Sequence, residues 1–168
     1  MYIKRIADNF LLKSVKNKKI EIILGARQVG KTTLVKHFLA GKKAVFLNLD
    51  IEVDKNRFLA LAELEPDQAV KAVGDPDFII IDEAQRLKNA SQIVKGWYDA
   101  AVKPKIILLG SSSLDLINQS AESLTGRNEK LFLPPLLFKE MIASQSWFSD
   151  FFDKNSLIKN FSPQINSL

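Results

Sequence analysis

Residues Gly25 to Thr32 have the types and spacing of a loop that binds phosphate groups. They read GARQVGKT, which matches glycine, four variable residues, glycine, lysine and threonine. Glycines at both ends let the backbone fold tightly, so that its N–H groups can surround an anion. The residues expected to contact a bound nucleotide are Gly25, Ala26, Arg27, Gln28, Val29, Gly30, Lys31, Thr32 and Thr33.

Two side chains at the end of this loop have specific expected roles. The ammonium group of Lys31 should reach the β- and γ-phosphates, and the hydroxyl of Thr32 should ligate Mg²⁺. A helix that begins at this point would add the positive end of its dipole. The competing interpretation is a glycine-rich turn between a strand and a helix, followed by Lys and Thr without a ligand.

A pair of acidic residues, Asp82 and Glu83, follows the apolar run FIII. Asp82 ends that run and is expected to hold Mg²⁺, often through water. Glu83 comes next and could polarise a water molecule for attack on the γ-phosphate. By itself, an apolar strand followed by acidic residues is equally compatible with a solvated pair of carboxylates in a loop.

Three further sites are candidates for the same reaction. Ser111 or Ser112, after the apolar run IILL, could sense the γ-phosphate, or these serines could cap the next helix. Arg127 follows a glycine of the kind that ends helices, so it could neutralise transition-state charge in its own chain or in a neighbour's. It could equally be a surface or packing arginine. Arg27, inside the loop, could serve in the same way, although an arginine at this position more often points to solvent or to a partner.

Strands and helices alternate along the chain, which predicts a parallel sheet covered on both faces. The fold class is therefore three-layer α/β. Apolar runs that are buried on both faces are typical of internal parallel strands, and 78–81 and 105–109 are such runs. Strands are expected at 20–24, 44–49, 78–81, 105–109 and 130–133, and helices at 3–16, 31–40, 52–74 with a break at Pro66, 90–101 and 113–123.

Composition excludes several classes of site. The chain has 168 residues, no cysteine and one histidine, so disulfides, thiolate metal sites and multi-histidine zinc centres are excluded. His37 is expected on a helix surface. The net charge of +5 is concentrated in residues 1–60, which favours an anionic partner such as nucleic acid or an acidic protein, or simply a solvated face. Without a long apolar stretch, a membrane location is not expected, and the cytoplasm is the predicted location.

With these residues in place, the chain resembles the AAA-type P-loop ATPases that occur as stand-alone predicted ATPases in bacteria and archaea. The motifs that carry the resemblance occur in the family's order: GARQVGKTTL (Walker A), IDEAQR (Walker B), GSSS, SLTGR and the segment PLLFKE. The resemblance implies the sheet order 5-1-4-3-2, with ATP at the carboxyl ends of the strands. Relatives commonly have Thr where this chain has Leu109, so a serine must be the sensor or the sensor is absent.

The resemblance also implies the domain organisation. Relatives continue into a C-terminal domain that looks winged-helix or nuclease-like. We therefore expect an ATPase domain at 1–145 and, at 146–168, an aromatic helix or tail that either docks on this domain or is the start of a truncated second domain.

The predicted function is Mg²⁺-dependent ATP binding with slow or partner-stimulated hydrolysis. ATP is favoured over GTP by the resemblance and by the lack of an NKxD motif. The alternative is a nucleotide-gated module that binds DNA or protein with little turnover, and oligomerisation fits either. A small-molecule kinase is disfavoured by the pair Asp82-Glu83.

Overall fold

The computed structural model describes residues 2–111 and 122–144. The chain divides into two compact units. The larger unit is Ala7–Pro135, and the smaller one combines the residues up to Ile6 with those from Leu136 onward. Each unit is described separately below.

The larger unit is built on a five-stranded sheet in the order β2-β3-β4-β1-β5, with every pair of neighbours parallel. This order is the predicted 5-1-4-3-2 in reverse. The strands are β1 (Ile20–Leu24), β2 (Ala44–Asn48), β3 (Phe78–Asp82), β4 (Lys105–Gly110) and β5 (Asn128–Phe132).

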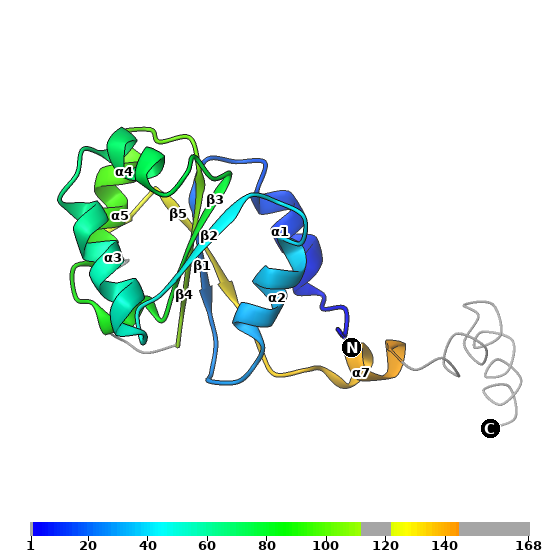
Figure 1. Ribbon diagram of the computed structural model, residues 1–168. Helices are drawn as coiled ribbons and strands as arrows, with labels where there is room; N and C mark the ends of the chain where they lie inside the picture. The colour runs from blue at the N-terminus through cyan, green and yellow to red at the C-terminus, as the bar shows by residue number, and fades with distance from the viewer. Residues whose placement is uncertain (1, 112–121, 145–168) are drawn as a thin grey trace, which may run out of the picture. The chain divides into compact units, whose positions relative to one another are not determined.

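Helices cover both faces of the sheet, which confirms the three-layer prediction (Figure 1). One face carries α1 (Ala7–Ser14) and α2 (Lys31–Phe38). The other face carries α3 (Glu52–Ala62), α4 (Pro66–Ala72) and α5 (Ala90–Asp99). The connections from β1 to β2, from β2 to β3 and from β3 to β4 each include a helix, as crossovers between parallel strands usually do.

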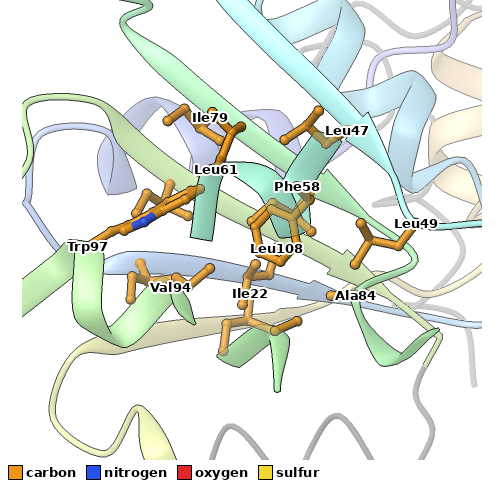
Figure 2. Close-up of a cluster of buried hydrophobic side chains, with 14 of the residues drawn as sticks. Ile22, Leu47, Leu49, Phe58, Leu61, Ile79, Ala84, Val94, Trp97 and Leu108 are labelled. Atoms are coloured by element: carbon orange, nitrogen blue, oxygen red, sulfur yellow. The ribbon is translucent and has the colours of Figure 1, made fainter. Parts of the chain in front are cut away.

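The hydrophobic core explains why the internal strands are apolar on both faces. All five residues of β1 are buried, whereas the edge strands β2 and β5 are mostly half-buried. Figure 2 shows one core cluster, between the sheet and the helices α3 and α5. At its centre the rings of Phe58 and Trp97 meet edge to face, with centroids 5.6 Å apart. Complete burial of a ring such as Phe58 contributes about 1.5–3 kcal/mol.

The observed elements differ from the expected ones mainly at their ends. The helix predicted at 3–16 is α1, which spans only Ala7–Ser14, and the residues before it belong to the other unit. The helix predicted at 52–74 is divided as expected, and Pro66 occupies the first turn of α4, where a missing N–H costs nothing. A short 3₁₀ turn, η1 (Ala84–Arg86), was not predicted. Most of the helix predicted at 113–123 lies outside the described residues.

The smaller unit contains α7 (Phe138–Ala143), a helix that the sequence reading did not predict. Within this unit the Arg5 guanidinium lies 2.9 Å from the Glu140 carboxylate, and both side chains are about 5% exposed. Glu140 also accepts hydrogen bonds from the backbone N–H groups of Ile6 and Leu137. Burial alone would raise the pKa of Glu140, but these two N–H donors and the guanidinium outweigh it and lower that pKa below 4.5.

The predicted boundary at 145/146 stays a prediction, because residues 145–168 lie outside the described part of the chain. No helix in the described ranges is both long and apolar enough to cross a membrane.

Candidate functional site

The sheet places three of the predicted motifs along one edge. The loop Gly25–Gly30 follows β1, Asp82 ends β3, and Ser111 follows β4. Leu24 pairs with Gly110 in the register of β1 and β4, so both strands end at the same level. In open α/β sheets, ligands bind at the carboxyl ends of the strands, at the point where the order of the strands reverses.

The loop has the backbone conformation that a glycine-rich anion site needs. Gly30 has a φ of 94° and immediately precedes α2, and Gln28 has a φ of 64°. The alternation of left-handed and ordinary residues turns consecutive N–H groups toward one side. Ala26, Arg27 and Gln28 are exposed.

Lys31, the first residue of α2, is buried directly after the loop. Its side chain reaches back, and Nζ donates to the carbonyl oxygens of Gly25 at 2.9 Å and Ala26 at 3.0 Å. The residue is 6% exposed. A buried ammonium group held over a backbone anion site is suited to bind phosphate oxygens. Thr33, two positions on, is exposed, as is His37 on the same helix, in agreement with the expected helix-surface histidine.

The structure brings the two predicted Mg²⁺ ligands together across fifty positions of sequence. Thr32 Oγ1 donates to Asp82 Oδ2 at 2.7 Å. Asp82 Oδ1 accepts from the backbone N–H of Glu83 at 2.9 Å, which fixes the orientation of the carboxylate. Adjacent hydroxyl and carboxylate oxygens are ligands that Mg²⁺ prefers, and Mg²⁺ usually takes few protein ligands beside phosphate and water. The described residues hold no group of three or more His, Asp or Glu that could bind a metal ion without other ligands.

Glu83 has a strained backbone at this edge. Its φ is 53°, a left-handed conformation that costs a non-glycine residue about 1–3 kcal/mol. Its Oε2 accepts a hydrogen bond from Gln85 Nε2 at 2.5 Å. The sequence reading did not assign a role to Gln85, although it lies two residues beyond Glu83 within the quoted motif IDEAQR.

The remaining candidates have different positions. Ser111 is half-buried directly after β4, at the edge of the loop. Ser112 lies outside the described residues. Leu133, which the sequence reading did not single out, follows β5 and donates its N–H to the Leu24 carbonyl at 2.7 Å, immediately before the loop. No signal in side-chain chemistry could have identified it, because its contact is made by the backbone.

Arg127 is not brought together with the loop. It precedes β5, and its carbonyl accepts from the N–H of Ile20, the first residue of β1. It therefore lies at the amino edge of the sheet, about 16 Å from the loop for a five-residue strand. Its Nε lies 2.6 Å from Asp99 Oδ1. Within its own chain, Arg127 is thus placed as a paired arginine. Arg127 was expected to neutralise transition-state charge either in its own chain or in a neighbour's. Its distance from its own loop is compatible only with the second of these roles.

Comparison with known proteins identifies the family. The family model of the AAA domain matches residues 17–142. Uncharacterized proteins of Mycobacterium bovis and Mycobacterium tuberculosis are each 33% identical over 144 residues, covering 84% of this chain. One from Methanocaldococcus jannaschii is 33% identical over 145 residues, covering 83%. The chain spans 31% of the length of each of these relatives.

The fold has counterparts among solved structures. The Aeropyrum pernix ORC1 protein, solved in complex with DNA, aligns with a TM-score of 0.57 and 13% identity. The alignment covers 89% of this chain and 50% of that one. At this identity the likeness concerns the fold. From the extent of the family match and from the order of the sheet, the chain belongs to the AAA-domain family of P-loop ATPases and is an ATPase-like, nucleotide-binding module.

Proposed function

We propose that this domain binds ATP with Mg²⁺ at the carboxyl edge of the sheet and hydrolyses it slowly or when a partner stimulates it. The observation that carries the proposal is the 2.7 Å contact between Thr32 and Asp82, next to the buried ammonium of Lys31. The two oxygen groups that would ligate Mg²⁺ and the ammonium group that would bind phosphate thus come from neighbouring positions at one edge of the sheet. The preference for ATP over GTP rests on the family resemblance.

Each residue has a task that follows from its position. The N–H groups of residues 25–32 and the start of α2 bind the phosphates, with Lys31 adding a full positive charge. Thr32 and Asp82 hold Mg²⁺, which would neutralise charge on the phosphates. Ser111 or Ser112 is the proposed sensor of the γ-phosphate, and the position of Ser111 directly after β4 supports this role.

Glu83 is the proposed base that orients water for attack on the γ-phosphate. Its hydrogen bond from Gln85 supports this role, because an oriented carboxylate presents one oxygen in a fixed direction. The strained backbone supports it as well, since such strain tends to persist at functional sites.

The test is a calorimetric titration with Mg-ATP and Mg-GTP. Wild type should bind ATP more tightly than GTP, and Lys31→Ala should abolish the binding. Lys88→Ala removes an exposed lysine outside the phosphate loop and should bind as wild type does. If Lys31→Ala bound Mg-ATP as tightly as Lys88→Ala, the loop would not be the nucleotide site.

A second candidate function is a nucleotide-gated module that holds DNA or protein. It is favoured by the charge of residues 1–60, which contain thirteen Lys and Arg against five Asp and Glu. A DNA titration over a range of salt, with and without ATP, separates the two candidates. An ATP-dependent change in affinity or in salt slope would support gating, and identical curves would remove the DNA version.

A further inference from the structure

A recess of about 570 Å³ lies at the amino edge of the sheet, at the opposite end of the strands from the proposed ATP site. It opens where β1, β3 and β4 begin, and Ile20, Phe78 and Lys105 form part of its wall. The rest of the wall comes from the turn at 15–18, the segment 101–104, Asp77, Tyr98 and Ile106. Because Ile20 and Gly25 stand at opposite ends of β1, about 16 Å of strand separates the recess from the phosphate loop.

The wall combines apolar surface with an excess of positive charge. Val15, Tyr98 and Val102 contribute half-buried apolar and aromatic surface. The charged residues in the lining are the lysines Lys16, Lys18, Lys103 and Lys105, with Asp77 as the single acid. A volume of this size lies in the range of sites that bind small organic molecules.

One of these lysines holds the wall in place. Lys105 Nζ donates to the Ser14 carbonyl at 3.0 Å and to the Asn17 side chain at 3.1 Å, and it also contacts the Lys19 carbonyl. These bonds fix the turn after α1 against the start of β4. The recess is therefore formed before any ligand arrives, which reduces the ordering cost of binding.

The other three lysines are available to a ligand. Lys16, Lys18 and Lys103 are exposed, and within the described ranges their ammonium groups make no hydrogen bond or ion pair. A bare anion would gain little from such exposed groups, because water and salt screen them. A ligand that also fills the apolar part of the recess would gain from both.

We propose that this recess is a second ligand site, which takes a small organic anion: an apolar or aromatic body that bears a phosphate, sulfonate or carboxylate group. The body packs against Tyr98 and Val102, and the anionic group lies among Lys16, Lys18 and Lys103. The site is independent of the proposed ATP site. Its failure and the failure of the ATP proposal are therefore separate results.

The test uses 8-anilinonaphthalene-1-sulfonate, a fluorescent aromatic sulfonate, with the full 168-residue chain. The double variant K18E/K103E reverses two charges in the recess. Its control, K13E/K88E, makes the same change of net charge at exposed lysines outside the lining. We expect saturable binding to wild type and to the control, and binding about tenfold weaker or more in the recess variant. Amide shifts of Tyr98 and Val102 on titration would locate the probe.

Two competitions test the chemistry and the independence. Saturating Mg-ATP should leave probe binding unchanged. Inorganic phosphate should displace the probe only at concentrations far above that of the probe. Equal binding by the two double variants would overturn the proposal. So would displacement of the probe by Mg-ATP, or by phosphate at equal concentration, since the first would place the probe at the ATP site and the second would describe a simple anion site.

Discussion

A Cβ atom on Gly25 would lie 2.5 Å from the carbonyl oxygen of Leu133. The backbone that leaves β5 thus packs directly against the first residue of the phosphate loop, and the N–H of Leu133 bonds to the Leu24 carbonyl. The first glycine of the loop is therefore required by a neighbouring segment as well as by its own turn. The structure of the loop depends on residues more than a hundred positions away.

Gly25→Ala should distort the loop and weaken Mg-ATP binding at least tenfold, because the obstructing atom is backbone and cannot rotate away. The matched control is Gly96→Ala. Gly96 is an exposed residue inside α5, and a Cβ there would meet nothing within 4 Å. That change should stabilise the protein by about 0.5–1 kcal/mol, because alanine loses less backbone entropy in a helix. Calorimetry and thermal unfolding measure both, and ATP affinity equal in the two variants would contradict the first expectation.

Glu83→Gln should leave Mg-ATP binding unchanged and lower turnover by about 10²–10⁴-fold, the usual contribution of a positioned base. Glu83→Gly should lose turnover as well but should raise the midpoint of thermal unfolding, because glycine adopts a φ of 53° without strain. Steady-state kinetics and thermal scans on the same two variants check this pair of outcomes. Full turnover in Glu83→Gln would remove Glu83 from the mechanism.

Arg127, placed far from its own phosphate loop, should act on a neighbouring chain's nucleotide. Arg127→Ala alone and Lys31→Ala alone should each lack stimulated turnover. Mixing the two should restore part of it, because one chain keeps an intact ATP site and the other keeps its arginine. The measurement is ATPase activity against mixing ratio and total concentration. Activity in Arg127→Ala equal to wild type would leave the Arg127–Asp99 pair with a structural role.

Glu21 and Lys105 form a buried ion pair in which Lys105 has other hydrogen-bond partners and Glu21 has none among the described residues. Glu21 is completely buried, and among the described residues its carboxylate oxygens lack hydrogen-bond donors within bonding geometry, although Lys105 Nζ lies 3.5 Å away. Lys105 instead bonds several oxygen acceptors. Burial raises the pKa of Glu21 above 4.5, despite the opposing charge of Lys105, and burial also lowers the pKa of Lys105 below 10.5.

Substitutions of Lys105 and of Glu21 should therefore lower the free energy of unfolding by different amounts. Lys105→Met leaves a buried carboxylate unpaired and should cost about 3–5 kcal/mol at neutral pH, whereas Glu21→Gln should cost far less. Since a raised pKa means that the folded state holds its proton more tightly, stability falls as pH rises from 4.5 through the folded pKa of Glu21. Lys105→Met should regain stability below that window. Urea unfolding followed by Trp97 fluorescence, in a Trp147→Phe background, tests this, and equal losses in the two variants would contradict it.

Glu140 should hold the two segments of the smaller unit together. Because its pKa is lowered, its contribution is complete above pH 4.5 and is lost as pH falls through the folded pKa. Glu140→Gln should reduce the hydrogen-exchange protection of the Ile6 and Leu137 amides, the two groups that donate to its carboxylate. Lys139→Gln, an adjacent exposed change, should leave both amides protected. Unchanged protection in Glu140→Gln would remove this role.

The sequence by itself determined the strands and the chemistry of the loop. Apolar runs such as 78–81 are long enough to identify buried parallel strands, and the motif from Gly25 to Thr32 requires its own backbone conformation. The sheet class and the chemical type of the candidate site were therefore predictable from the residues, whereas the order of the strands was implied by the resemblance to the AAA-type P-loop ATPases.

The tertiary structure decided which residues meet. The Thr32–Asp82 contact and the Gly25–Leu133 approach join positions that only strand order and register bring together. The left-handed Glu83, the buried pairs Glu21–Lys105 and Arg5–Glu140, and the separation of Arg127 from the loop have the same origin. Local sequence patterns report the periodicity of one element, whereas these contacts depend on the distances between elements.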